Sequence, residues 1–550
     1  MNKPAALSIE PVRLGGMPIA WKFAEQLRLN DALEKHVPSD PRDLLPVSST
    51  LSIALINVIL ERFPLYKMGE WARERRLLDE NLADYLNDDR VGRALDRLFR
   101  ADRAALLTEI VLRAIEVFSL DTSRVHNDST TVTLTGQYHG YPKSKAAKPK
   151  RGHNKDHRPD LKQLLFSLSV LGDGAVPLYF KVWDGNVTDD RTHIKNWMAL
   201  RGLLGRADFT YVTDCKLCTR ENMEFIDSEG GFFVTVMPQT RTEDRRFKDW
   251  IQDQAPQWQE VARKPDPNRK YAPQHVYWTF ESPFPSAEGF RILWVRSSQK
   301  QSLDAASRTR AIEKTEQDLS DLSSRNHRNR EKLEATIQEI LTSRKTEQFF
   351  RVKTEVRVEE RYRQEHKGRP SKDTRYRKTE KKGYGFTWEH DQAAIRYAAK
   401  CDGLFPLITN RKDPAKEILK IYKFQPRLER RHSQLKSVYD VRPVFLKNPE
   451  RIEALLFLYF VALLIDGLVE RETRKAMKEQ KLDTVPIYPE ARACRRPTAD
   501  KVFELFRDVR LHRVITPGHT QYLPDELSPV QRQVLDLLKL PVDKFFETPR

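Results

Sequence analysis

The sequence predicts an α/β protein in which a mixed β-sheet core is interrupted by a large α+β insertion and preceded by a helical domain. Apolar residues recur at helical spacing through the first 118 residues, whereas short runs of β-branched and aromatic residues dominate from residue 120 onward. About 160 residues then separate these runs from a further core strand, and a gap of that length requires a folded insertion.

These boundaries divide the 550 residues into five parts. They are a mainly helical domain (1–118), the first part of the core (119–240), the insertion (241–400), the second part of the core (401–475) and a C-terminal tail (476–550). The helical domain opens with a short strand at 11–14 and contains apolar helical segments at 51–65 and 91–117. It could bind a partner, dimerise or only pack against the core.

The core is expected to contain three strands, a helix, a strand, a helix and a strand, which is the order of a ribonuclease-H-like domain. The second and third strands form a hairpin about Gly172-Asp173-Gly174, and the second helix begins at Thr219. The strands are expected at 123–134, 164–171, 176–183, 209–213 and 232–237, and the helices at 192–204 and from 219.

The insertion is expected to contain an antiparallel helical hairpin with strand-like segments before and after it. The strands are expected at 277–281, 291–295 and 349–362, and the helices at 303–323 and 328–343. The core then closes with a strand at 403–410, a helix from about Pro426 and an apolar helix around 455–464. The tail contains a segment at 499–510 and a capped helix from Ser528 with Pro529 at its first position.

The composition indicates a polyanionic partner, because the formal charge is +18, the pI is near 9.5 and the aromatic content of 9% argues against a disordered basic tail. Four cysteines make no disulfide framework and no signal peptide is visible, so we expect a cytoplasmic protein. The longest apolar run, 454–465, is too short to cross a membrane, and no membrane partner is expected. Cys215 and Cys218 form a CxxC sequence that fits buried thiols better than a zinc site.

Three carboxylates form a candidate metal site. Glu429 is a single acid among basic residues such as Arg427 and Arg430, an unusual place unless it holds a cation, and a solvated charged helix is the alternative. Asp128 and Asp214 lie at or near two predicted strands, which bring them together at the carboxyl ends of neighbouring strands. Two strand carboxylates and one helix carboxylate supply the hard oxygen ligands of a two-metal phosphodiester site.

These residues resemble a motif of the transposases of insertion-sequence family four. Its Y-(2)-R-(3)-E-(6)-K signature is similar in spacing to Tyr422, Gln425, Glu429 and Lys436. Asp128 in HNDSTTVTLTG resembles the first aspartate of that family, and Asp214 in VTDCKLCTRENM resembles the second. The similarity continues through HRPDLKQ (157–163), WDGNVTDD (183–190), DGLFPLITN (402–410) and RPVFLKNPERIEALLFL (442–458), and covers most of residues 90–470.

The resemblance implies a DDE transposase in which Asp128, Asp214 and Glu429 bind two Mg²⁺ ions, for which Mn²⁺ could substitute. One ion would activate a water that hydrolyses a phosphodiester at each transposon end, and the other would stabilise the leaving 3′ oxygen before the freed 3′-OH attacks target DNA. The resemblance implies that the protein binds double-stranded DNA as a homodimer and is associated with the nucleoid. It also implies that the helical domain (1–118) binds the DNA ends or dimerises. Relatives can form a hairpin at the cut end with a flipped base, for which Trp278, Trp294 and Trp388 are candidates unless they belong to the core.

Two basic stretches are candidate DNA contacts, residues 143–162 and 366–382, each with eight Lys or Arg against two acids. A solvated loop is the alternative for the first, whose His153 and His157 fit DNA contacts or surface positions better than metal ligands. The candidate DNA-binding residues are Tyr422, Gln425, Arg427, Arg430, Arg431 and Lys436, with Lys148, Lys150, Arg151, Lys155 and Arg158.

The chain departs from the signature at Gln425, where the family has arginine; an amide carries no charge and no five-donor fork. Pro426 is expected to begin the Glu429 helix, so Tyr422 would close the preceding one and the signature would not share one straight stripe. Glu429 and Lys436 are expected two turns apart on one helical face. Two other functions remain open: a metal-dependent nuclease without strand transfer, and a DNA-binding or scaffolding protein that has lost catalysis.

Overall fold

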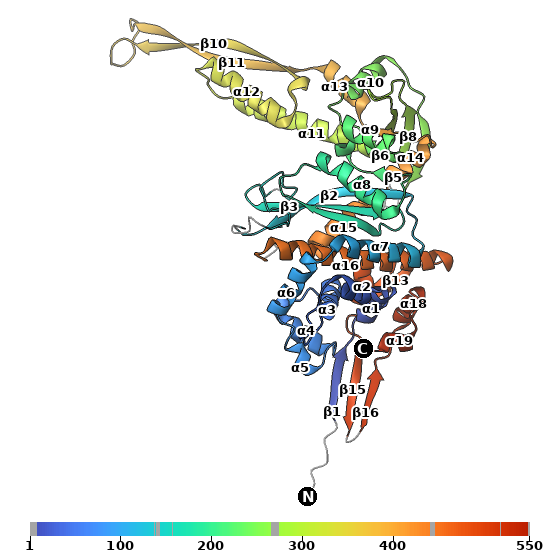
Figure 1. Ribbon diagram of the computed structural model, residues 1–550. Helices are drawn as coiled ribbons and strands as arrows, with labels where there is room; N and C mark the ends of the chain where they lie inside the picture. The colour runs from blue at the N-terminus through green and yellow to red at the C-terminus, as the bar shows by residue number, and fades with distance from the viewer. Residues whose placement is uncertain are drawn as a thin grey trace. The chain divides into compact units, whose positions relative to one another are not determined.

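The computed structural model describes residues 8–136, 138, 144–156, 158–265, 274–439, 446–516 and 519–547. The chain forms two compact units, one of Met1–Thr235 with Lys420–Arg550 and the other of Val236–Leu419 (Figure 1). The three candidate acids and the signature residues all belong to the first unit.

The sheet strands of the first unit lie in the order β4-β3-β2-β5-β6, and those of the second unit lie in the order β12-β9-β8-β7. The strands from the first part of the core are β2 (Arg124–Leu134), β3 (Lys162–Leu171), β4 (Pro177–Trp183), β5 (Thr210–Val212) and β6 (Phe232–Val236). Strand β3 pairs antiparallel with β2 and β4, whereas β5 pairs parallel with β2 and β6. The predicted α/β fold class with a mixed sheet is confirmed, and the core elements follow one another along the chain in the predicted order.

Local sequence explains these elements. Strand β3 is buried along nearly its whole length, which fits its apolar run LLFSLSVL. The hairpin to β4 turns through Gly174 (φ 75°) and Ala175 (φ 57°), in the left-handed region that tight turns use. Helices α8 (His193–Leu204) and α9 (Arg220–Ser228) follow, and the Thr219 side chain caps α9 by accepting from the Asn222 N–H.

The N-terminal helices are α1 (Met17–Gln26), α2 (Leu29–His36), α3 (Val47–Leu60), α4 (Met68–Glu74), α5 (Glu80–Ala83), α6 (Asp88–Arg100) and α7 (Arg103–Phe118), with the 3₁₀ turn η1 (Leu65–Lys67). Of these, α1, α3 and α6 pack against the long helix α16 (Pro449–Glu479), which also contacts β4. Helix α16 is long and apolar enough to cross a membrane by length and composition, but 83% of its most apolar window is buried inside the protein. Figure 1 shows α16 between the strands β2 and β3 and the N-terminal helices, and its buried apolar side chains contribute to the core there.

The C-terminal tail returns to the N-terminus in a small sheet that the sequence did not predict. Strand β1 (Ser8–Arg13) pairs with β15 (Arg510–Thr516), which pairs with β16 (His519–Pro524). Strand β16 is exposed along its length, so its sequence lacks the alternation that marks a half-buried strand. The remaining elements are β13 (Val485–Tyr488), η6 (Pro489–Ala491), β14 (Arg492–Cys494), α17 (Ala499–Leu505), α18 (Pro529–Leu537) and α19 (Val542–Phe546), and α18 carries the expected Ser528 cap.

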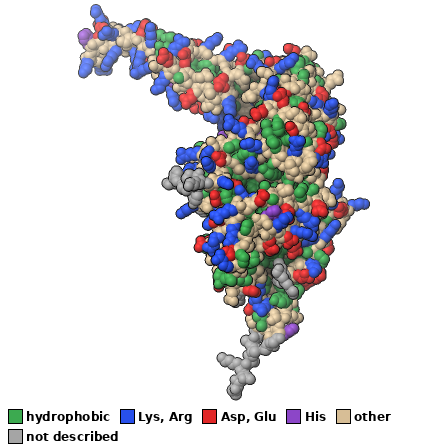
Figure 2. Space-filling view, in the orientation of Figure 1, with side chains coloured by type: hydrophobic (Ala, Val, Ile, Leu, Met, Phe, Trp, Pro, Cys, Tyr) green, Lys and Arg blue, Asp and Glu red, His purple; other side chains and the backbone are tan. Residues whose placement is uncertain are grey.

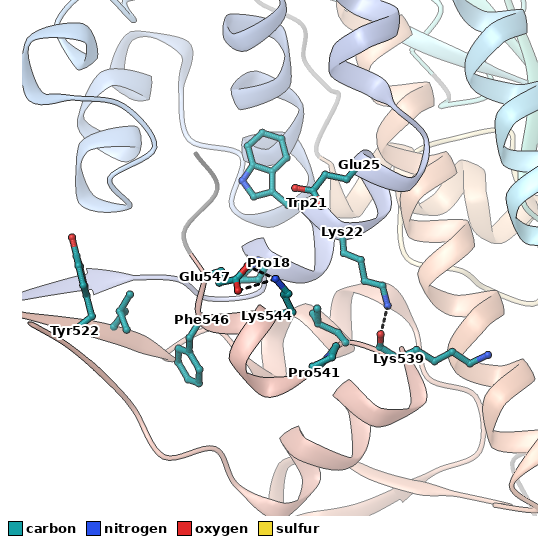
Figure 3. A pocket seen from close by; sticks show the side chains of 12 residues that line it. Pro18, Trp21, Lys22, Glu25, Tyr522, Lys539, Pro541, Lys544, Phe546 and Glu547 are labelled. Atoms are coloured by element: carbon teal, nitrogen blue, oxygen red, sulfur yellow. Dashed lines mark hydrogen bonds and ion pairs between the residues drawn. The ribbon is translucent and has the colours of Figure 1, made fainter.

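A cavity of about 850 Å³ opens between α1, the β15–β16 hairpin and α19 (Figure 3). Its lining mixes both charges: Lys22 donates to the Lys539 carbonyl oxygen at 2.8 Å, and Lys544 pairs with Glu547 at 2.9 Å. None of the candidate site residues lines this cavity, so it is separate from the site that the sequence predicts.

The second unit contains β7 (Gln259–Lys264), β8 (His275–Glu281), β9 (Arg291–Ser297) and β12 (Leu404–Thr409), with helices α10 (Thr242–Asp253) and α13 (Gln392–Cys401). The expected helical hairpin is α11 (Ser298–Ser323) and α12 (Arg330–Arg344), followed by η4 (Glu347–Phe349), β10 (Phe350–Gln364) and β11 (Tyr376–His390). Trp294 stacks on Phe247 with ring centroids 4.0 Å apart, and Trp388 packs against the core under β10, so both serve the interior of this unit.

Candidate active site

Asp128 and Asp214 lie at the same level of two neighbouring strands. Strands β2 and β5 run parallel with Arg124 opposite Thr210 and His126 opposite Val212, and Asp128 and Asp214 follow two residues further along each chain. Burial raises the pKa of Asp214, and the nearby charges of Asp128 and Asp189 raise it further. Acids 86 positions apart in sequence are thus brought into electrostatic contact by the sheet.

The ammonium group of Lys155 lies among these acids. Its Nζ is 3.1 Å from Oδ2 of Asp189 and 3.9 Å from Oδ1 of Asp128. It also donates to the carbonyl oxygen of Ser129 at 2.5 Å. Burial works to lower the pKa of Lys155, but the charges of the three acids outweigh it and hold the pKa above its usual value. Asp128, Asp189 and Asp214, which we call the acid group, therefore already attract one cationic side chain.

Helix α15 (Pro426–Ser433) packs against β2 and brings His432 to Asp128. The His432 side chain is buried, and its Nδ1 lies 3.4 Å from Oδ2 of Asp128. Burial works to raise the pKa of Asp128, but the hydrogen bond with His432 and the charge of Lys155 lower it below its usual value. Asp128 therefore keeps its negative charge at neutral pH although it is enclosed.

Glu429 lies on the exposed side of α15, about one turn before His432. Burial, together with the charges of Asp214 and Glu429, raises the pKa of Tyr422 to about 12, so both acids lie near that ring. The three acids are not gathered as ligands, since none of the described residues form a group of three His, Cys, Asp or Glu arranged to hold a metal ion. The sheet and helix α15 thus bring the three acids into one region, but the described residues do not form a complete set of metal ligands.

The signature residues do not lie on one regular helix. Tyr422 ends α14 (Ala415–Tyr422), and Pro426 begins α15 as the sequence predicts. The chain then winds into one π-helical turn, η5 (Gln434–Val438), which carries Lys436. The prediction that Glu429 and Lys436 stand two α-helical turns apart on one face is therefore wrong, because a π turn is wider than an α turn.

Lys436 and Gln425 are engaged within the protein. Nζ of Lys436 lies 2.8 Å from Oδ1 of Asp156. The buried Gln425 donates from Nε2 to the Asn127 carbonyl oxygen at 3.3 Å, and its Oε1 lies 3.2 Å from Nδ1 of His126. We therefore correct the expected DNA contact by Gln425: its amide ties α15 to β2, a buried position that suits a neutral side chain better than an arginine.

Arg431, which the sequence placed among the DNA-binding residues, is buried. Its guanidinium donates to the Ala175 carbonyl oxygen at 3.0 Å and to Gln434 at 2.9 Å, and pairs with Glu470 at 3.0 Å. The predicted contact with DNA is wrong for this residue, because a guanidinium enclosed by these partners cannot reach a phosphate.

Arg427 and Arg430 remain exposed on α15. Burial of its inner part, together with the charges of Arg496, Arg474 and Arg430, lowers the pKa of Arg427. Arg474 donates to the Pro497 carbonyl oxygen at 2.7 Å, which holds it beside the segment of Arg496, and its own charge is partly neutralised by Glu470 at 3.1 Å. We call these four residues, Arg427, Arg430, Arg474 and Arg496, the arginine cluster. Like charges held together in this way favour a bound anion.

Three basic residues of the loop 143–162 form ion pairs, two of them with acids outside the loop and one with an acid of the loop itself. The ion pairs are Lys150–Asp184 at 2.9 Å, Arg158–Asp160 at 2.8 Å and Lys155–Asp189 at 3.1 Å. The premise of an unpaired cluster is therefore wrong for these three basic residues, because acids of the same chain neutralise them. Lys148 and Arg151 are exposed, whereas Lys143 and His157 lie outside the described residues.

Sequence reasoning did not single out Asp189 or His432. Asp189 belongs to WDGNVTDD, one of the segments that carry the family resemblance, so a signal was present there. His432 is a lone histidine in a charged helix, and nothing in its surroundings marks it before the helix is docked on β2. Cys215 and Cys218 are free thiols, and burial raises the pKa of Cys215, which disfavours a metal-binding thiolate.

Comparison with known proteins gives two similarities. Residues 11–112 match the model of a family described as a domain of unknown function, DUF4277. No curated protein matches the chain. Among solved structures, the chain is similar to the cryo-EM structure of the piggyBac transposase synaptic complex with hairpin DNA, at 7% identity and a TM-score of 0.35, with 84% of this chain and 77% of that chain covered. The family match lies in the helical N-terminal part and includes none of the candidate site residues.

Proposed function

We propose that this chain is a DNA transposase that hydrolyses phosphodiester bonds at transposon ends in a metal-dependent reaction and transfers the strands into target DNA. The observation that carries the proposal is the placement of Asp128 and Asp214 on neighbouring parallel strands, with the Lys155 ammonium held by the acids. A group of acids that draws a cation to the carboxyl end of β5 has the chemistry that a divalent ion requires. The resemblance to family-four transposases supports the same reading.

The donor set fits a hard divalent cation. Carboxylate oxygens are the ligands that Mg²⁺ and Mn²⁺ prefer. Burial is the main cause that raises the pKa of Asp214, and the charges of Asp128 and Asp189 raise it further. Asp128, Asp214 and Glu429 are the residues that would hold two such ions. Bound there, the ions would activate a water and stabilise the leaving 3′ oxygen.

The surrounding side chains would position the DNA. Arg427 and Arg430 present guanidinium groups on the helix of Glu429, and each can grip a phosphate with two parallel hydrogen bonds. Tyr422, whose pKa is about 12, keeps its proton at neutral pH and can donate a hydrogen bond. His432 holds Asp128 in its ionised form. The acids would thus stay charged while the arginine cluster binds the nucleic acid backbone.

The proposal includes the partners that such a reaction requires. The substrate is double-stranded DNA, both as transposon ends and as target, and two ends must be held together, which a homodimer on DNA would do. A cytoplasmic protein bound to the nucleoid fits the high positive charge.

Incubating the full chain with Mg²⁺, its own transposon ends and a target plasmid, and then sizing the products, tests the proposal. We expect strands cut at the ends and joined to the plasmid, and no products when a chelator removes the metal. Cut ends without joined products would indicate the alternative, a metal-dependent nuclease. DNA binding without any cleavage would contradict the proposal and leave a DNA-binding protein.

A further inference from the structure

The second unit carries a long two-stranded ribbon. Strands β10 and β11 pair antiparallel from Phe350 opposite His390 to Gln364 opposite Tyr376. Only the base of the ribbon is covered, where Phe350 and Phe386 join the core of α11 and α12. Beyond this base, the eight residue pairs of 357–364 with 376–383 extend about 27 Å at about 3.4 Å per residue. Figure 1 shows this part projecting past α12.

The net charge of this projecting part lies on one face. Because side chains alternate along a strand, the odd-numbered residues share one face and the even-numbered residues share the other. The odd-numbered face carries five basic residues, Arg357, Arg361, Arg363, Arg377 and Lys381, and one acid, Glu359. Figure 2 shows Lys and Arg side chains gathered along the projecting ribbon.

The even-numbered face is electrically balanced. Lys378 pairs with Glu360 at 2.5 Å and with Glu380 at 3.4 Å, and Lys382 is the other basic residue there. The same face packs on α11 and α12 at the base of the ribbon and continues outward as exposed Val358 and Tyr362. The odd-numbered face therefore points away from the helices and is open along its whole length.

Arg363 and Arg377 are direct cross-strand partners. Like charges directly opposite each other destabilise a sheet, and no ion pair relieves either arginine among the described residues. Arg361, one step inward, is only partly neutralised by Glu359 at 3.1 Å. A ribbon built only for stability would not hold this pair together, whereas an anion bound between the two guanidinium groups removes the repulsion.

We infer that the odd-numbered face of the ribbon binds duplex DNA, with the ribbon lying along a groove and its arginines on the phosphates; this deepens the proposed function and rests on it. The major groove is about 12 Å wide and admits a two-stranded β-ribbon. The projecting 27 Å approaches one helical turn of about 34 Å, so arginines along it can contact phosphates on both sides of the groove. Such contacts bind DNA of any sequence.

Gly385 adds a second observation about the same face. A methyl group at this position would collide with the guanidinium of Arg357, which lies across the glycine on the odd-numbered face. Because Gly385 has no side chain, the Arg357 guanidinium can lie directly against the backbone of β11. Alanine would displace Arg357 without changing the charge of the ribbon.

The test compares pairs of substitutions in the full chain. Arg363→Gln with Arg377→Gln removes two charges from the odd-numbered face, and Lys378→Gln with Lys382→Gln removes two from the even-numbered face of the same strands. The measurement is the affinity for a random-sequence duplex several helical turns long, followed over a range of salt concentrations. We expect the arginine pair to weaken binding about tenfold and to reduce the slope of log K against log salt by about two units, and the lysine pair to do less than half of this.

Gly385→Ala should weaken binding severalfold at unchanged net charge and unchanged melting temperature. Equal losses with the arginine and lysine pairs would overturn the inference, because they would show a general charge effect instead of contact through one face. If the wild-type chain binds duplex DNA but the arginine variant has the same slope of log K against log salt, the inference about the ribbon is overturned and the proposed function is not affected. Loss of binding through dissociation of an oligomer, seen by sedimentation, would make the ribbon a protein contact and also overturn it. A wild-type chain that binds no duplex would contradict the proposed function itself.

Discussion

The ammonium nitrogen of Lys155 lies 3.9 Å from a carboxylate oxygen of Asp128, with Asp189 at 3.1 Å on its other side. This lysine comes from the basic loop that the sequence assigned to DNA binding, yet its positive charge interacts with Asp128, Asp189 and Asp214. A cation already held there must compete with any divalent ion that the same acids bind. We therefore expect the charge of Lys155 to weaken the binding of a divalent ion to Asp128 and the neighbouring acids.

Lys155→Met should tighten the binding of Mn²⁺, measured by calorimetric titration of the DNA-free protein, by about tenfold, because it removes a neighbouring positive charge worth more than about 1 kcal/mol at this distance. Lys150→Met is the matched control, since Lys150 pairs with Asp184 outside the acid group. Weaker or unchanged binding in Lys155→Met would show that the acids do not form the ion site.

Glu429→Gln separates binding from chemistry. The substitution keeps the size of the side chain but removes the charge that would hold a hard cation. DNA affinity in a gel shift should be unchanged or higher, because one repulsive charge disappears, while nicking of a duplex with transposon ends should fall by several orders of magnitude. Nicking at the wild-type rate would make Glu429 an exposed surface acid with no part in the reaction.

Two neighbouring arginines of α15 should behave in opposite ways. Arg431→Gln removes one of the two arginines that pair with the buried Glu470, the other being Arg474 at 3.1 Å, and it removes the donors to the Ala175 carbonyl oxygen and to Gln434. It should lower the free energy of unfolding by about 1 to 3 kcal/mol. Arg430→Gln, at an exposed position of the arginine cluster, should leave stability within about 0.5 kcal/mol and weaken DNA binding. Denaturant unfolding and gel-shift titration of both variants check this, and a stable Arg431→Gln protein would contradict the buried ion pair.

Asp466 should make stability depend on pH. Burial of this carboxyl on α16 raises its pKa to about 8, although it accepts a hydrogen bond from Tyr439. A raised folded-state pKa means that the stabilising contribution is complete below the unfolded pKa of about 4 and is lost as the pH rises to about 8. Asp466→Asn should therefore gain stability relative to wild type across this range in urea unfolding. The exposed Asp536→Asn is the control, and parallel pH curves for wild type and Asp466→Asn would contradict the burial effect.

The sequence predicted the strands and helices whose patterns are local. The β2 run, the hairpin at Gly172-Asp173-Gly174 and the helix start at Pro426 all appear where expected, because β-branched runs, turn glycines and prolines act within a few residues. The exposed strands β11 and β16 were missed, since they bury no alternating face. Their pairing depends on partners that the local pattern does not encode.

The site was predictable to a smaller extent. Asp128 and Asp214 could be placed on neighbouring strands from the order of the core elements. The roles of Arg431 and Lys155 could not, because a basic residue in a charged stretch looks the same whether it faces solvent or a buried acid. Only the docking of α15 on β2 and the fold of the loop decide which charges are neutralised.

The central claim is that Asp128 and Asp214 form the catalytic centre, and metal-dependent nicking by Asp214→Asn tests it most directly. The asparagine keeps the shape of the side chain but removes the charge that a divalent ion requires. Measured beside wild type and the exposed control Asp208→Asn, on a duplex that carries the transposon ends in Mg²⁺, the variant should bind DNA at least as tightly as wild type. Its nicking should fall by several orders of magnitude, while Asp208→Asn nicks normally. Nicking by Asp214→Asn at the wild-type rate would contradict the assignment of this pair of acids as the active site.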